Sequence, residues 1–233
     1  MQEMTSSLVR AFELLISLDP VLYGIIFLSL QVSGLAVIAA AALGVPAGAG
    51  LALVRFPGRE AVVSLLNTFM GLPPVVVGLV VYLILSRSGP MGFLGFLYSP
   101  TAMIAAQTVL AFPIVAALTH AGIASVDPIV KDAIRSLGAT TSQAARLIVS
   151  EARYAILAAV IAGYGRAAAE VGAVLMVGGN VEGYTRVMTT AIALETSRGD
   201  FELALALGIV LLFLSLVVNL ALRAVQKRGA LIR

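Results

Sequence analysis

The sequence predicts an all-α membrane protein that crosses the bilayer about five times. Hydrophobic residues make up 60% of the 233 residues and charged residues only 12%, whereas an ordinary soluble domain has roughly 25% charged residues. The mean hydropathy is +1.04. The apolar residues also gather in stretches of about 20, the length that an α-helix needs to cross hydrocarbon. Five stretches qualify: roughly Val21–Leu43, Val62–Leu85, Thr101–Ala121, Ala155–Val177 and Leu203–Leu222.

Residues 1–20 form a separate N-terminal segment. It has acidic residues and no basic stretch before its short apolar core, so it does not resemble a secretory signal peptide. Its apolar side chains fall at helical spacing on one face, which predicts an amphipathic helix lying at the membrane surface. That face consists of Leu8, Phe12, Leu15 and Ile16, with Arg10, Glu13 and Ser17 elsewhere.

The first apolar stretch continues to Phe56, which makes it too long for one straight crossing and too short for two. Glycine and proline weaken or interrupt a helix, so a break or a tilt is expected at the end of this stretch. The residues concerned are Gly44, Pro46, Gly48 and Gly50.

Three further prolines fall at membrane depth, Pro73 and Pro74 in the second span and Pro113 in the third. Proline removes a backbone donor, which is tolerated there only where neighbours, water or a cavity satisfy the freed carbonyl groups. These positions are therefore hinge or gate candidates. The alternative is a set of static kinks that only shape helix packing.

The distribution of Lys and Arg predicts which side of the membrane each loop occupies. Cytoplasmic loops carry the excess of these residues, and a chain with its N-terminus outside and its C-terminus inside puts ten of the 15 on the inner side. The ten are Arg55, Arg59, Lys131, Arg135, Arg146, Arg153, Arg223, Lys227, Arg228 and Arg233. The polar segment 127–153 is then cytoplasmic.

The segment 127–153 is a polar island between two spans, and its pattern predicts two short helices joined by a tight turn. Asp127 followed by Pro128 is a good helix start. Gly138 ends this helix, and Thr140 with Gln143 forms a capping box that begins the next one. An apolar stripe at helical spacing runs along the first helix, whereas Lys131, Asp132 and Arg135 are expected to face water. The stripe comprises Ile129, Ala133, Ile134 and Leu137.

Asp132, Ala133, Gly138 and Ile148 resemble the acidic–Ala–x₄–Gly–x₉–Ile loop of the permease subunits of binding-protein-dependent ABC importers. Two features depart from that loop: Ile134 replaces the usual second alanine, and Ser150-Glu151 stands where many members carry Leu-Pro. The segment 165–180, GRAAAEVGAVLMVGGN, resembles the oxyanion branch of the family, the sulfate, molybdate and tungstate permeases. Taken with Leu72-Pro73-Pro74 and Phe112-Pro113, it looks closest to tungstate permeases.

The resemblance implies a type I ABC importer fold, with residues 21–233 as the permease domain and 127–153 as the coupling loop. It implies a homodimer that works with two cytoplasmic ABC ATPase subunits and an extracytoplasmic oxyanion-binding protein. The cargo would be tungstate first, then molybdate or sulfate, moved by alternating access. The residues implied to dock the ATPase are Asp132, Ala133, Ile134, Leu137, Gly138, Ala139 and Ile148.

Arg166 and Glu170 are an opposite-charge pair inside a span, spaced so that they meet on one helix face. They are candidates for an anion pathway, and the alternative is a structural pair that locks helices together. Gly178, Gly179 and Asn180 end the fourth span, where freed N–H groups could meet an anion. The alternative for these three is a simple helix C-cap.

Other functional classes find little support in the sequence. The chain has no phosphate-binding loop and no hydrolase motif, so ATP hydrolysis would fall to a partner subunit. It has no Cys and a single His, His120, which indicates neither a metal site nor a cofactor. The basic residues at span ends reflect topology and do not imply nucleic acid. The main alternative is a secondary transporter or channel without an ATPase; an intramembrane enzyme lacks an acid/base constellation.

Overall fold

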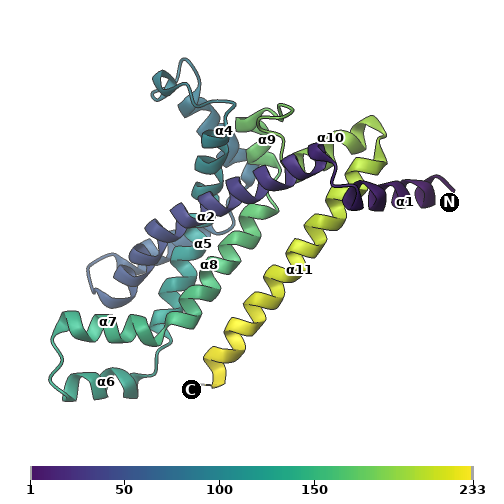
Figure 1. Cartoon of the computed structure of the whole chain (residues 1–233). Helices are drawn as coiled ribbons and strands as arrows, with labels where there is room; N and C mark the ends of the chain where they lie inside the picture. Colours follow the sequence, from purple (N-terminus) through teal and green to yellow (C-terminus); the bar gives the residue numbers. More distant parts are fainter. Residues whose placement is uncertain (1, 232–233) are drawn as a thin grey trace.

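The computed structural model describes residues 2–231, which are helical and contain no β-strand. The chain folds as an elongated helical bundle (Figure 1). Its α-helices are α1 (Gln2–Ile16), α2 (Pro20–Leu53), α3 (Arg59–Phe69), α4 (Pro74–Leu85), α5 (Pro100–Ala124), α6 (Pro128–Ser136), α7 (Thr141–Glu151), α8 (Arg153–Ala168), α9 (Gly172–Gly178), α10 (Met188–Arg198) and α11 (Phe201–Leu231), with a short 3₁₀ helix η1 at Gly92–Leu94.

Three of these helices, α2, α5 and α11, are each long and apolar enough to cross a membrane. The second and fourth predicted spans are not single helices. The second is split between α3 and α4, which are bent by 100° relative to each other. The fourth is split between α8 and α9, because α8 ends at Ala168 and α9 begins at Gly172. The pair α7 and α8 is also bent, by 60°, so that up to five spans are present when each bent pair counts as one.

The expected break in the first apolar stretch is wrong, because α2 continues without interruption to Leu53, with Pro46 inside it. A 34-residue helix is about 51 Å long. The glycines serve packing instead. A Cβ atom at Gly48 would lie 2.9 Å from the Thr119 side chain of α5, and one at Gly44 would lie 3.1 Å from Val115. Small residues at this spacing let two helix backbones approach closely.

The core has two main parts. One lies between α2, α4, α5 and α9 and includes Val32, Met103, Leu110 and Val174. The other lies between α1, α2, α10 and α11 and includes Ala11, Leu22 and Leu207. By contrast, α11 buries only 17% of its most apolar window, so its outer face is apolar and uncovered. Such a face suits contact with lipid.

The N-terminal helix α1 packs on α11 and is held there by the Arg10–Glu202 ion pair at 2.7 Å. Of the stripe expected to face the membrane, Phe12 and Ile16 are exposed, whereas Leu15 packs against the bundle together with Ala11 and Leu14. The side chain of Leu8 lies outside the described residues, as does Arg233. Phe12 and Ile16 are available for contact with the membrane surface, and the interfacial position of α1 stays a prediction.

The bundle has two distinct ends (Figure 1). The helices α6 and α7 lie at one end together with the C-terminus, whereas α1, α10 and the loop after α4 lie at the other. This separation matches the predicted sidedness of the loops, in which the loop 127–153 and the C-terminus share one side of the membrane.

Candidate functional site

The segment 127–153 forms the predicted pair of short helices. Asp127 accepts a hydrogen bond from the Ile129 amide at 2.8 Å and so caps the start of α6. Gly138 has a φ of 78°, a left-handed conformation that glycine adopts without strain. The amide of Thr140 donates to the Gln143 side chain at 2.8 Å, and the Gln143 amide donates to the Thr140 hydroxyl at 3.4 Å. The capping box is therefore confirmed.

The apolar stripe of α6 lacks a covering element within residues 2–231. The side chain of Leu137 is 86% exposed and that of Ile129 is 74% exposed. Ala133 and Gly138 are also exposed, while Ile134 and Ala139 are half-buried. Exposed apolar residues clustered on one helix face mark a contact surface for another protein.

The other side of the α6–α7 pair anchors it to the bundle. Ile148 and Val130 pack against a small cluster of Ile123, Val126 and Ala152 at the ends of α5 and α8. Lys131 does not face water only, because its ammonium group donates to the Ala124 carbonyl at the end of α5, at 3.1 Å. These contacts connect α6 and α7 to the ends of α5 and α8. In this arrangement Ile148 is an anchor and not part of the exposed stripe.

The Arg166–Glu170 pair lies where α8 gives way to α9. The Arg166 guanidinium donates to Glu170 Oε2 at 2.9 Å. The second oxygen of Glu170, Oε1, accepts the Ala173 amide of α9 at 3.1 Å. Glu170 is 3% exposed, whereas the Arg166 side chain is 32% exposed. One carboxylate thus joins the end of α8 to the start of α9.

Two polar side chains from other helices hold the same break, and the sequence did not single them out. Gln107 of α5 donates to the Ala167 carbonyl at 3.0 Å. Thr189 of α10 donates to the Glu170 carbonyl at 2.8 Å. The Ala167 carbonyl also accepts the Glu170 amide at 3.2 Å, so Gln107 adds a second donor there, and Thr189 supplies a donor to the Glu170 carbonyl beyond the end of α8. The signal that could have found Gln107 is its amide, which is isolated in a long apolar stretch.

The α3–α4 break lies next to the α8–α9 break. Pro73 and Pro74 do not kink a continuous helix; they precede and begin α4, where a missing N–H has no cost. Gly172 of α9 faces Val75, since a Cβ atom there would come 3.0 Å from the Val75 side chain. The two short half-helices α4 and α9 therefore begin side by side. Pro113 is different, because it is buried inside an uninterrupted α5.

The geometry of Gly178, Gly179 and Asn180 is that of a helix C-cap. Gly179 has a φ of 71° and donates its amide to the Leu175 carbonyl at 3.0 Å. The Thr185 hydroxyl donates to the Gly178 carbonyl at 2.6 Å. The amide nitrogen of the Asn180 side chain donates to the Thr190 carbonyl at 3.4 Å. Backbone groups here have partners within the chain, which favours the capping interpretation.

His120 lies near the α6–α7 end of α5 and contacts the Arg59 guanidinium at 3.1 Å. Within the part of the chain that the structure describes, no three His, Cys, Asp or Glu side chains converge in a way that could hold a metal ion. His120 therefore serves as a hydrogen-bonding side chain between α3 and α5.

Residues 42–229 match the protein family described as binding-protein-dependent transport system inner membrane component. The chain belongs to this family. It is the permease part of a transport system, and the exposed α6–α7 pair and the two broken spans are features of that permease.

Curated relatives support the assignment over most of the permease. It is 46% identical over 203 residues to a probable anion ABC transporter permease protein of Haloferax volcanii, covering 85% of this chain and 88% of the relative. It is 42% identical over 217 residues to the tungstate uptake system permease protein TupB of Peptoclostridium acidaminophilum, covering 93% and 95%. It is 28% identical over 220 residues to the molybdenum transport system permease protein ModB of Escherichia coli K12, covering 88% and 95%.

Solved structures agree on the fold of the permease. A chain of the MetNI methionine ABC transporter, in an inward-facing crystal form, superposes with a TM-score of 0.74 at 20% identity, covering 90% of this chain and 98% of that chain. A chain of a bacterial alginate ABC transporter superposes with a TM-score of 0.74 at 19% identity, covering 97% and 88%. The all-helical fold of an ABC importer permease is thus confirmed.

Proposed function

We propose that this permease is the homodimeric membrane subunit of an ATP-driven importer for a small tetrahedral oxyanion, with tungstate first and molybdate or sulfate next. The observation that carries the proposal is its 42% identity, over 93% of the chain, to a permease named for tungstate uptake. Relatives named for molybdenum and sulfate transport match at 28% and 29% identity. All three cargoes are tetrahedral dianions, so one pathway chemistry serves them.

The permease receives its energy through α6 and the Gly138 turn. The exposed Leu137 and Ile129 side chains supply an apolar surface for a separate ATPase subunit, because a helix in a groove is recognised through such a stripe. Each copy of the chain carries one such surface, so a homodimer engages two ATPases. When ATP draws the ATPases together, Ile148 and Lys131 carry the movement into α5 and α8.

The anion passes beside the two broken spans. Half-helices whose N-termini meet at membrane depth place partial positive charge there, and this favours an anion. Arg166, one-third exposed beside this point, is paired with Glu170 and offers an anion its remaining guanidinium N–H groups. Pro73 and Pro74 at the break are the hinge candidates, and Pro113 shapes α5. Gly178, Gly179 and Asn180 lie further along the same course, at the end of α9.

A second copy of the chain completes the path. One face of α4 carries apolar side chains that the described residues leave exposed, and it begins at the break. The exposed residues are Val75, Val76, Leu79, Val80 and Leu83. In the assembled transporter this face meets its counterpart and closes the pathway against lipid. The outer ends of the dimer then receive the extracytoplasmic binding protein.

The proposal is tested by reconstituting the permease with its ATPase and binding protein in proteoliposomes. Wild-type complex is expected to accumulate tungstate only with ATP. Gly138→Asp abolishes uptake while membrane insertion is unchanged. Gly58→Asp is the matched control, because Gly58 also has a positive φ, 85°, and open surroundings but lies between α2 and α3, outside the α6–α7 pair. If uptake persists in Gly138→Asp, or if no ATPase co-purifies, the proposal is wrong. The protein would then be a secondary transporter or a channel.

The orientation, with the N-terminus outside and the C-terminus inside, has its own test. The natural chain has no cysteine, so single cysteines report position directly. Ser142→Cys on α7 should react with a membrane-impermeant maleimide only after cells are permeabilised. Ser88→Cys in the loop after α4 should react in intact cells. The reverse pattern would remove the ATPase from reach of α6 and overturn the proposal.

A further inference from the structure

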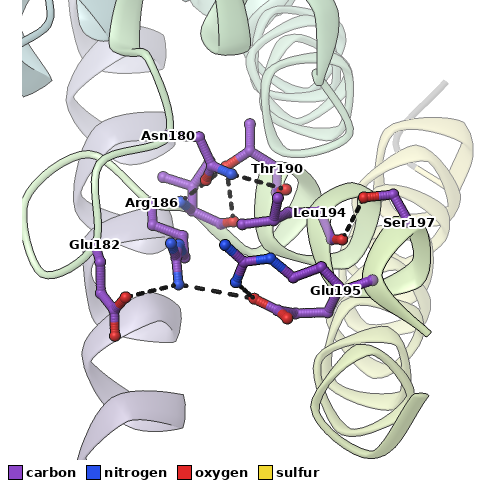
Figure 2. A network of polar contacts seen from close by, with 9 residues as sticks. Asn180, Glu182, Arg186, Thr190, Leu194, Glu195 and Ser197 are labelled. Carbon is purple, nitrogen blue, oxygen red and sulfur yellow. Dashed lines mark hydrogen bonds and ion pairs between the residues drawn. The ribbon is translucent and has the colours of Figure 1, made fainter. Parts of the chain in front are cut away.

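A cluster of four charged side chains lies at the end of the bundle opposite α6, between the α9–α10 loop and α10 (Figure 2). Its centre is Arg186, whose side chain is 9% exposed. Arg186 Nη1 lies 3.4 Å from Glu182 and 3.7 Å from Glu195. Arg198 in turn lies 3.4 Å from Glu195. Each buried charge therefore has one exposed partner of opposite sign.

These contacts are loose compared with other ion pairs of the same chain. The Arg166–Glu170 and Arg10–Glu202 pairs have N···O distances of 2.9 Å and 2.7 Å, the range of strong charge-assisted hydrogen bonds. Those of Arg186 are 3.4 Å and 3.7 Å. The two ion-pair contacts of Arg186 lie outside this range and are therefore weaker than those of the other two pairs. Its present partners are thus replaceable.

The cluster has an unused hydrogen-bond donor, which can bind an acceptor from outside the chain. Arg186 Nε is buried and has no hydrogen-bond partner among the residues that the structure describes. Arginine has five N–H donors and no acceptor, and buried N–H groups are normally bonded. Glu195, by contrast, leaves no buried side-chain oxygen without a partner in the same set. Asn180 Oδ1, in the same network (Figure 2), is an acceptor without a partner among these residues, whereas Arg186 is the charged group with an unused donor, and that donor suits an anion.

The exposed carboxylate of Glu182 is the group that a ligand of Arg186 would displace. The Glu182 side chain is 70% exposed, and the next residue, Gly183, has a φ of 70° with open space around it. With Glu182 in place, two arginines and two glutamates balance. When its carboxylate moves away, Arg186, Arg198 and Glu195 leave one net positive charge at the rim, which attracts a dianion.

We propose that Arg186 is the core of an oxyanion-binding site at the outer mouth of the permease, and that the Glu182 carboxylate occupies this site until an oxyanion replaces it. The site would hold the anion after the binding protein releases it and before it reaches Arg166. Thr189 of α10, the helix that carries Glu195 and Arg198, donates to the carbonyl of Glu170, the partner of Arg166. This inference rests on the proposed function, which places this end of the bundle outside.

The site is tested by tungstate binding to the purified permease–ATPase complex without binding protein, with ATP and a hydrolysis-deficient ATPase to hold one state. Bound tungsten is counted by mass spectrometry after equilibrium dialysis. Arg186→Gln should weaken tungstate binding by at least about tenfold, because charged hydrogen bonds are lost. Glu182→Gln should tighten it about two- to fivefold, since an exposed competitor is removed. Arg87→Gln, which removes an exposed charge from the other outer loop, should change nothing.

Two further variants separate the site from a purely structural ion cluster. Removing Arg186 alone leaves Glu195 buried with one partner, which can impair folding. The double variant Arg186→Gln with Glu195→Gln keeps the net charge of the cluster, and its folding is checked by thermal melting. It should bind tungstate more weakly than wild type does, as Arg186→Gln should. Arg186→Lys, which keeps the charge without the planar fork, should bind with intermediate strength.

The outcomes are distinct. The Arg186 site is overturned if the double variant binds tungstate as tightly as wild type does. It is also overturned if Glu182→Gln binds tungstate no more tightly than wild type does. Wild-type complex that transports tungstate but retains none without binding protein also overturns it. If wild-type proteoliposomes transport no oxyanion at all, the proposed function has failed instead.

Discussion

Gly78 of α4 lies directly against Ala173 of α9: a Cβ atom at position 78 would come 2.7 Å from the Ala173 Cα atom. The contact joins the second halves of the two broken spans. It forms because neither residue has a side chain that would keep the two backbones apart. The half-helices that border the proposed pathway therefore move as one unit, each fixed to the other close to its start.

Gly78→Ala should consequently destabilise the bundle. The added methyl group meets backbone, which cannot rotate away, and overpacking of this kind costs about 1–3 kcal/mol. Thermal unfolding in detergent measures the effect, and tungstate uptake should fall with it. Gly34→Ala in α2 is the matched control, since a Cβ atom there meets nothing within 4 Å. Equal melting temperatures for the two variants would contradict the proposed fixation of α4 to α9.

Local patterns in the sequence predicted local structure well. The start of α6 at Asp127, the Gly138 turn and the Thr140 capping box all depend on residues within a few positions of one another. The same holds for the Arg166–Glu170 contact, which has a spacing of four residues. Such features follow from backbone geometry alone. They form in the same way whatever the rest of the bundle does.

The α8–α9 break was not predicted, because it depends on partners distant in the sequence. The α3–α4 break, by contrast, falls at Pro73 and Pro74, which the sequence marked as hinge or kink positions. Apolar residues continue on both sides of Glu170, so one span was expected there, and the contacts that Gln107 and Thr189 make at the break come from other helices. Conversely, α2 was expected to break and continues, with Gly44 and Gly48 packed closely against α5. The cluster around Arg186 likewise joins a loop to α10. None of these pairings leaves a periodic signal in the chain.

Leu137→Asp tests whether the exposed stripe of α6 is a docking surface. At 86% exposure Leu137 contributes little to the fold, so the free energy of unfolding should change by no more than about 0.5 kcal/mol. Co-purification of the ATPase and uptake should nevertheless be lost, because a charge is placed in an apolar contact. Ser142→Asp at the exposed start of α7 is the control. A marked loss of folded permease in Leu137→Asp would make the stripe a folding element.

Glu170→Gln and Glu170→Ala divide the two tasks of this side chain. Glutamine keeps an oxygen acceptor for the Ala173 amide but lacks the charge that pairs with Arg166, while alanine lacks both. Loss of a helix N-cap costs about 0.5–2 kcal/mol, so the melting temperature should decrease in the order wild type, Glu170→Gln, Glu170→Ala. Melting curves of both variants in detergent give the order. Equal melting of the two would mean that the carboxylate does not cap α9.

Arg166→Ala separates a transport role from a structural one. The Arg166 side chain is one-third exposed. If it lowers the barrier for the anion, its loss slows uptake far more than it lowers the melting temperature. Glu170 keeps its bond to the Ala173 amide in this variant, which preserves the start of α9. Arg10→Ala is the control, because it removes another paired arginine. The Arg10 side chain is 64% exposed, and its ion pair is worth at most about 1 kcal/mol. Initial rates of tungstate uptake, normalised to folded complex, decide between the roles: a rate that falls only in proportion to folded protein assigns Arg166 to structure.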